Sequence, residues 1–155
     1  MIKYLINIDG EKETQKLGYE IGKLLFPGSV VSLTGDLGVG KTTFTKSIAK
    51  ALNIKQVVNS PTFTIIKEYE GDLNLYHMDV YRISDKEDLG FDEYFFNDGI
   101  TVIEWAENIK SLLPYERLNI VLKKISENKR IIEINPLGNK YEYLCEVLKN
   151  EKIID

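Results

Sequence analysis

The segment Ser29-Val-Val-Ser-Leu-Thr-Gly-Asp-Leu-Gly-Val-Gly-Lys-Thr42 carries the strongest structural signal in this 155-residue chain. Its first six residues are β-prone and nearly all apolar, which is typical of a strand buried on both faces. The other eight, residues 35–42, match the pattern G-x-x-x-x-G-K-[ST] in full. We predict a strand, a glycine-rich loop (the P-loop, residues 35–42) and a helix over about 41–52, the first half of a βαβ unit.

The residue types of the P-loop suit the binding of nucleotide phosphates. Glycines let the backbone curl so that successive N–H groups point at phosphate oxygens at a helix N-terminus. The Lys41 ammonium is expected to reach the β- and γ-phosphates, and the Thr42 hydroxyl to ligate Mg²⁺. The expected nucleotide contacts are Gly35, Asp36, Leu37, Gly38, Val39, Gly40, Lys41, Thr42 and Thr43.

The composition is that of a soluble globular protein. Hydrophobic residues make up 43% and charged residues 28% of the chain, and its apolar runs are too short to cross a membrane. The N-terminus lacks the apolar stretch of a signal peptide, so we expect a cytoplasmic protein with no membrane partner. A single cysteine, Cys145, excludes an internal disulfide and a multi-cysteine metal site. The net charge of -4 argues against nucleic-acid binding driven by bulk charge, although it leaves room for a local patch.

Apolar periodicity and Gly/Pro breaks predict one α/β domain over residues 1–155, with a mixed central sheet flanked by helices on both faces. Together with the P-loop, this arrangement predicts a P-loop NTPase fold. The expected strands are 3–8, 29–34, 63–69, 73–79, 100–104, 118–125 and 130–135, and two hairpins join 63–69 to 73–79 and 118–125 to 130–135. The expected helices are 11–25 (capped by Asp9), 41–52, the segment from 105 to about 113, and 140–149, with a short helix and loop within 85–97.

Two carboxylates can complete the site, because a P-loop needs an acid at the end of a neighbouring strand. Asp79 ends the strand 73–79 and Glu104 ends the strand 100–104. Either can point at the phosphates from the carboxyl edge of the sheet. One would hold Mg²⁺ through water while the other orients the attacking water or senses the γ-phosphate, and the sequence leaves that division open.

A few other residues are candidates for a role. Residues 60–62 (Ser-Pro-Thr) form either a nucleotide-sensing loop or an ordinary turn before a strand. Arg82 lies near the phosphates or on a partner-facing surface, whereas Arg130 can be a strand-edge cation with no role. His77, the only histidine, fits a packed or hydrogen-bonded position better than a direct role.

Several P-loop classes are disfavoured. A small GTPase needs D-x-x-G and N-K-x-D, but no Asp has Gly three residues later, and the near match at residues 139–142 opens a predicted helix. ATP is therefore the expected nucleotide. Nucleotide kinases usually carry an arginine-rich lid, which three scattered arginines cannot supply. A small-molecule P-loop kinase stays the alternative, and an ATP-gated binding module is a third hypothesis.

Four segments occur in the order Gly35-Asp-Leu-Gly-Val-Gly-Lys-Thr-Thr-Phe44, Ser60-Pro-Thr-Phe-Thr64, Tyr76-His-Met-Asp-Val-Tyr-Arg82 and Ile103-Glu-Trp-Ala-Glu107. This set resembles the bacterial TsaE (YjeE) family over roughly residues 9–135. The resemblance implies a cytoplasmic ATPase that acts with TsaB and TsaD and reaches tRNA through them. That complex transfers a threonylcarbamoyl group to the adenosine beside the anticodon of tRNAs reading codons that begin with A. The ATPase is required for turnover but is not the transferase.

The same resemblance implies roles for individual residues. Lys41 and Thr42 bind phosphate and Mg²⁺, and Asp79 and Glu104 are the essential carboxylates at the metal and the attacking water. The family favours Glu104 with Thr42 at the metal. Its Glu-x-x-Thr motif matches Glu11 and Thr14, which are expected on the base side of the nucleotide, and Trp105 is expected beside the carboxylates. The aromatic and acidic stretch 91–96 is either a docking surface or an amphipathic segment that closes the core.

Overall fold

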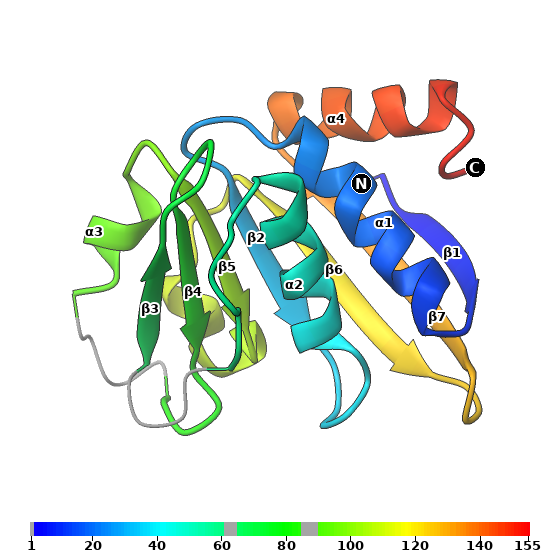
Figure 1. The fold of residues 1–155 in the computed structure, drawn as a ribbon, viewed down its shortest axis with the longest axis horizontal. Coiled ribbons are helices and arrows are strands. Elements are labelled where there is room, and N and C mark those ends of the chain that lie inside the picture. Colours follow the sequence, from blue (N-terminus) through cyan, green and yellow to red (C-terminus); the bar gives the residue numbers. More distant parts are fainter. Residues whose placement is uncertain (1, 61–64, 85–89) are drawn as a thin grey trace.

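A computed structural model of the chain describes residues 2–60, 65–84 and 90–155 (Figure 1). In this part of the chain, strands form one mixed sheet in the order β1-β7-β6-β2-β5-β4-β3. The strands are β1 (Tyr4–Asp9), β2 (Val30–Thr34), β3 (Ile66–Tyr69), β4 (Leu75–Asp79), β5 (Ile100–Glu104), β6 (Arg117–Lys124) and β7 (Lys129–Leu137). The helices are α1 (Glu11–Leu24), α2 (Lys41–Ala51), α3 (Asp92–Phe95), the 3₁₀ helix η1 (Ala106–Leu112) and α4 (Asn139–Asn150).

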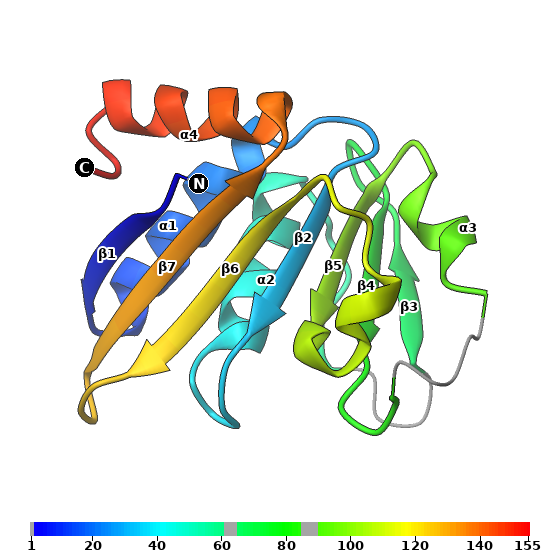
Figure 2. The same cartoon turned by 180° about the vertical axis from the view of Figure 1, so that it is seen from behind.

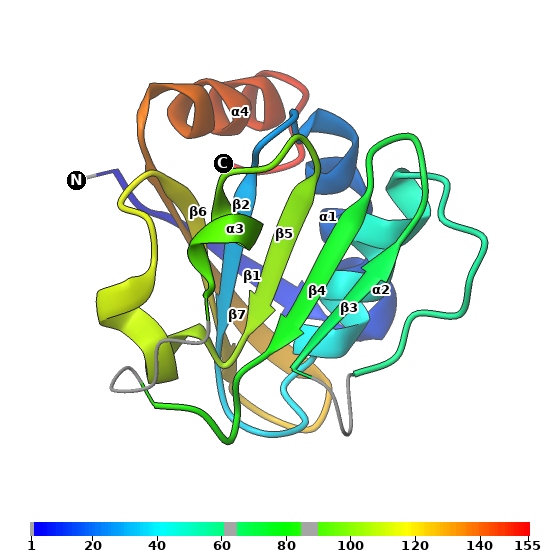
Figure 3. The same cartoon turned by 90° about the vertical axis from the view of Figure 1, so that its left-hand side faces the viewer.

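Strand β2 lies at the centre of the sheet. It pairs in parallel with β5, where Val31 is opposite Val102, and with β6, where Val31 is opposite Leu118. Its residues 30–33 are all buried, which explains their nearly continuous apolar run. Because β4 is parallel to β5, the carboxyl ends of β2, β5 and β4 meet at one edge. The P-loop and the chain after β4 leave the sheet at this edge (Figure 3).

Helices cover both faces of the sheet, as predicted. Helices α1 and α2 lie side by side over one face (Figure 1), and η1 and α3 lie on the other face over the β4–β5 side (Figure 2). The alternation of side chains along β2 matches these layers: Val31 and Leu33 pack into the core under α1 and α2, whereas Val30 packs with Phe91 and Phe95 in a second core. The stretch 91–96 therefore closes a core with most of its aromatic rings, and Phe96 alone among its phenylalanines is exposed.

Helix α4 closes the fold near the start of β2. It buries Tyr141, Leu144, Cys145 and Leu148 on one side, as its spacing predicts. The Tyr141 hydroxyl accepts a hydrogen bond of 2.9 Å from the Val30 N–H. This contact ties the last helix to the central strand.

One expectation about a helix end is wrong. Asp9 does not cap α1, because Gly10 occupies the N-cap with φ 90° and ψ 160°, and the Asp9 N–H instead donates to Oε1 of Glu13 at 3.0 Å. Glu11 and Glu13 supply negative charge to the first turn, where the helix dipole favours it. The helix expected up to about residue 113 is present as the 3₁₀ helix η1, with a kink at Ile109, and it follows Trp105, whose backbone is left-handed (φ 63°). Within the described ranges, no helix combines the length and apolarity that crossing a membrane requires.

Candidate nucleotide and metal site

The P-loop connects the carboxyl end of β2 to the N-terminus of α2. Gly40 occupies the N-cap of α2 in a left-handed conformation (φ 118°), so that the first helical amides face the loop. A Cβ at Gly35 would lie 2.6 Å from the carbonyl oxygen of Leu122, which leaves room for glycine alone. The loop therefore has the backbone of an anion-binding cradle at a helix N-terminus.

Lys41 lies inside this cradle with 5% of its surface exposed. Its Nζ donates to the carbonyl oxygen of Asp36 at 2.9 Å and also to that of Gly35, and it lies 3.9 Å from the centre of the Trp105 ring. Burial lowers the pKa of the Lys41 ammonium, while nearby carboxylates, Glu104 first, act to raise it. The ammonium is thus a partly desolvated cation at the loop.

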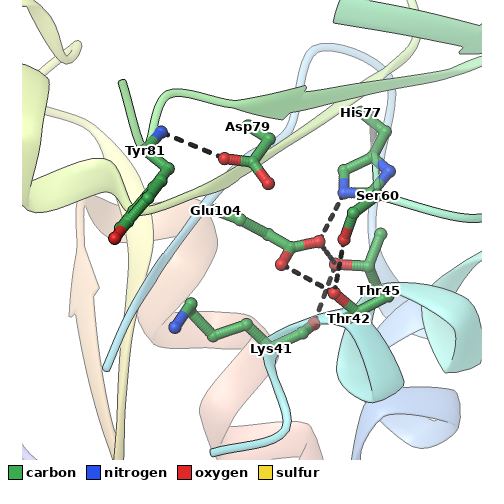
Figure 4. A network of polar contacts seen from close by, with 8 residues as sticks. All are labelled: Lys41, Thr42, Thr45, Ser60, His77, Asp79, Tyr81 and Glu104. Carbon is green, nitrogen blue, oxygen red and sulfur yellow. Dashed lines mark hydrogen bonds and ion pairs between the residues drawn. The ribbon is translucent and has the colours of Figure 1, made fainter. Parts of the chain in front are cut away.

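Glu104 is the centre of a buried polar network (Figure 4). Its Oε1 accepts a hydrogen bond of 2.9 Å from the Thr42 hydroxyl, which is also 2.8 Å from the Ser60 hydroxyl. Its Oε2 lies 2.5 Å from Nε2 of His77 and 3.4 Å from the Thr45 hydroxyl. Since a carboxylate only accepts, His77 is the donor. Contacts from α2 and β4 therefore fix both oxygens of a carboxylate that is only 2% exposed.

Asp79 lies next to Glu104, as the two predicted strand ends require. The two residues are directly opposite in the β4–β5 register. Oδ1 of Asp79 accepts from the Tyr81 N–H at 3.0 Å. Burial raises the pKa of the Asp79 carboxyl, and the hydrogen bond from Tyr81 opposes that shift. A cavity of about 350 Å³ brings these carboxylates together with the P-loop; its lining includes Leu37, Lys41, Thr42, Ser60, Asp79, Tyr81, Glu104 and Trp105.

A second cavity, of about 300 Å³, lies on the other side of the P-loop. Glu11 and Thr14 line it together with residues 38–40 and Thr43, so the structure places both residues of the Glu-x-x-Thr motif beside the loop. Arg130 lines it too, and its Nε donates to the carbonyl oxygen of Val39 at 3.1 Å. Arg130 is therefore more than a strand-edge cation. Its contact spans 91 positions in the sequence, and no local pattern signals it.

The donor set suits a magnesium ion that is held largely by phosphate and water. In the described part of the chain, no cluster of three or more His, Cys, Asp or Glu side chains could form a metal cage. Mg²⁺ usually takes one or two carboxylates, several waters and substrate phosphates. The Thr42 hydroxyl and the Glu104 carboxylate, with Asp79 alongside, offer oxygen ligands of this kind at the wall of the larger cavity.

Some residues that the sequence singled out lie outside the two cavities, and the structure adds contacts that the sequence did not predict. Arg82 is exposed and lines neither cavity, and Pro61 and Thr62 lie outside the described residues. His77 occupies a hydrogen-bonded position, as expected, and its partner is Glu104, which Thr45, a residue that the sequence did not single out, contacts as well. The alternation of β4 offered a signal for His77, because residues 77 and 79 share one face of a strand.

Comparisons with known proteins agree with this geometry. A family model described as "Threonylcarbamoyl adenosine biosynthesis protein TsaE" matches residues 8–132. The tRNA threonylcarbamoyladenosine biosynthesis protein TsaE of Bacillus subtilis (strain 168) is 53% identical over 145 residues, which cover 92% of this chain and 90% of that protein. The protein of the same name from Treponema pallidum (strain Nichols) is 42% identical over 126 residues, 79% of this chain and 93% of its own. The crystal structure of Bacillus subtilis YdiB matches with a TM-score of 0.87, 44% identity and 97% coverage of each chain.

The likeness to a solved structure confirms the α/β fold of a P-loop NTPase. The family match includes the P-loop, both strand-end carboxylates and the Glu-x-x-Thr motif, so it spans every part of the candidate site. The chain therefore belongs to the TsaE family, whose members take part in the biosynthesis of threonylcarbamoyladenosine in tRNA.

Proposed function

We propose that this chain is a cytoplasmic P-loop ATPase that binds Mg-ATP and hydrolyses it to ADP and phosphate in concert with the TsaB–TsaD complex. Through that complex it supports the threonylcarbamoyladenosine modification of tRNAs that read codons beginning with A. The observation that carries the proposal is the placement of Glu104. Its carboxylate is buried, held by Thr42 and His77, and faces the same cavity as the P-loop lysine.

Each residue of the site has a task in this proposal. The P-loop amides and Lys41 bind the phosphates, and Thr42 with Glu104 would hold Mg²⁺, which neutralises charge on the β- and γ-phosphates. Asp79 is free to orient the attacking water with the oxygen that Tyr81 does not bind. Because burial raises its pKa, Asp79 also accepts a proton more readily than an exposed carboxylate. Glu11 and Thr14 would contact the base side of the nucleotide in the second cavity.

The charges around the larger cavity support a need for partners. Lys41 is its cationic side chain, and the described residues that line it include no arginine. P-loop enzymes that lack an arginine at the transferred phosphate hydrolyse slowly until a partner supplies one. We therefore expect slow hydrolysis by this chain alone, faster hydrolysis with TsaB and TsaD, and tRNA contact mainly through those proteins.

The test is ATP turnover by the purified chain, alone and with TsaB and TsaD, following both released phosphate and modified tRNA. Stimulation by the partners, together with repeated rounds of modification that depend on hydrolysis, would support the proposal. Transfer of the γ-phosphate to a small acceptor, with no effect of the partners, would instead identify a small-molecule kinase.

Glu104→Gln separates an ATPase from an ATP-gated binding module. We expect this variant to bind ATP in a calorimetric titration yet fail to restore modification, because it removes the charge that would hold the metal. Glu68→Gln, an exposed change on β3, is the matched control and should behave as the wild type. Full modification by Glu104→Gln would show that nucleotide binding alone suffices.

A further inference from the structure

A groove between the outer faces of α1 and α2 carries an unusual concentration of positive charge. Lys12 and Lys16 on α1 and Lys46 and Lys50 on α2 line this α1–α2 groove, which encloses about 550 Å³. All four lysines are exposed. We propose that the α1–α2 groove binds the phosphate backbone of RNA and gives this chain a direct contact with tRNA.

The groove is positively charged, although the chain as a whole is negatively charged. The protein has a net charge of -4, yet four lysines and a single acid, Glu11, line the groove. Each lysine pair is spaced i, i+4 on its helix, an arrangement of like charges that opposes helix stability. Among the described residues none of the four forms an ion pair, whereas Lys23 on α1 bonds Glu20 at 2.9 Å. The groove therefore presents unneutralised ammonium groups, which is the electrostatic footprint of phosphate binding.

The two lysine rows, one on α1 and one on α2, are held at a fixed separation by the close packing of these helices. A Cβ at Gly18 would lie 2.9 Å from Cβ of Ser47, and one at Gly22 would lie 2.7 Å from Cβ of Ala51. Because glycine stands at both positions, α1 and α2 pack closely side by side (Figure 1). Helix packing, and not a loop, sets the separation of the rows, so the groove is formed before any ligand arrives.

RNA fits the groove better than an acidic polypeptide does. Tyr19 also lines it, with 38% of its surface exposed among the lysines. An exposed aromatic ring beside cations is the combination with which proteins stack bases while they hold the backbone. The family acts in tRNA modification, so RNA is present in its reaction.

The groove is continuous with the candidate nucleotide site. Glu11 and Thr43 line both the groove and the smaller cavity beside the P-loop. RNA in the groove would therefore lie against the first turn of α2, close to bound nucleotide. The inference rests on the family's role in tRNA modification and stands independently of ATP hydrolysis, which is tested separately.

The experiment measures binding of fluorescently labelled tRNA to the full chain by anisotropy over a series of salt concentrations. The test variant is Lys46→Glu with Lys50→Glu, and the control is Lys149→Glu with Lys152→Glu, which makes the same charge change in the last turn of α4 and just after it. The control is matched because Lys50 and Lys149 both lie in the last turn of their helices. Thermal melts establish that both variants are folded, and Lys46→Gln with Lys50→Gln provides a milder test.

We expect the wild type and the control to bind tRNA and the groove variant to lose most of this binding. The slope of log affinity against log salt should become shallower by about one for each phosphate contact removed. Equal binding by the groove and control variants, or no salt-dependent binding by the wild type, would overturn the proposal. Groove-dependent binding of polyglutamate but not of tRNA would overturn it as well, since it would assign the groove to an acidic protein.

Discussion

His77 occupies a buried, hydrogen-bonded position, and the structure identifies Glu104 as its partner. It is completely buried, its Nε2 contacts Glu104, and its Nδ1 has no hydrogen-bond partner among the described residues. Burying an imidazole ring with one unsatisfied nitrogen costs free energy of folding, and the hydrogen bond to Glu104 has to offset that cost. We infer that His77 is a positioning residue, which holds the carboxylate in the rotamer that faces Thr42.

Replacing His77 by leucine tests this role. His77→Leu removes the donor, whereas His77→Gln keeps an N–H group on a side chain of similar reach. Losing such a support typically lowers metal affinity or activity about 10–100-fold. We expect the Mg²⁺ concentration for half-maximal phosphate release to rise by that factor in His77→Leu and by less in His77→Gln. An unchanged Mg²⁺ dependence in folded His77→Leu would show that the histidine only fills space.

Side chains were predictable from the sequence where a local pattern fixes their place. Lys41 and Thr42 follow from the P-loop spacing, and Asp79 and Glu104 follow from the ends of two apolar strands, so their positions at one edge of the sheet were expected; their ligand roles stay predictions. Arg130 was not predictable in this way, because its contact with Val39 depends on how β7 is placed beside the loop.

The packing of α1 against α2 depends on how closely the two helices approach each other. Gly22→Ala would gain about 1 kcal/mol of helix propensity. The new Cβ would lie 2.7 Å from Cβ of Ala51 and 3.0 Å from Cα of Ile48, and overpacking of this kind costs about 1–3 kcal/mol. We expect the free energy of unfolding in urea to fall by up to about 2 kcal/mol. The control Gln15→Ala, on the exposed side of α1, should change the free energy of unfolding by less than about 0.5 kcal/mol. A Gly22→Ala variant more stable than the wild type would contradict this prediction, because it would mean that α1 and α2 can move apart at no cost.

The bond between α4 and β2 gives a second test of packing. Tyr141→Phe removes the hydroxyl that accepts from the buried Val30 N–H. An unsatisfied buried donor costs about 1–3 kcal/mol, and we expect that loss in the free energy of unfolding. Tyr143→Phe is the matched control, because the Tyr143 side chain is 69% exposed and its change should be close to neutral. Equal stabilities of the two variants would contradict a structural role for the Tyr141 hydroxyl.

Most elements were predictable because their periodicity is local. The apolar run of β2 and the alternation of β6 reflect burial, which the sequence records directly. The 3₁₀ character of η1 and the left-handed backbone of Trp105 before it were not, because no residue preference at these positions signals them.

Ionisation of the buried Cys145 thiol makes the stability of the whole fold depend on pH. Cys145 is fully buried, and burial raises the pKa of its thiol from 9.0 to about 12. Between these values the unfolded chain releases a proton that the folded chain keeps. The free energy of unfolding should therefore fall as the pH rises above 9, by at most about 1.4 kcal/mol per pH unit from this group. Urea titrations at pH 7.5 and 10 should show a smaller decline for Cys145→Ala than for the wild type, and identical declines would contradict the assignment.

The central place of β2 also sets the order in which the protein can mature on the ribosome. Val30, Val31 and Leu33 are synthesised well before the two neighbours of β2, which begin at residues 100 and 117. Until β5 and β6 have emerged, this apolar strand has no partner in the nascent chain and is exposed to aggregation. The P-loop is thus translated before both neighbours of β2 and can complete its shape only after them, so a chain that stops before β6 would carry the complete motif without a working cradle.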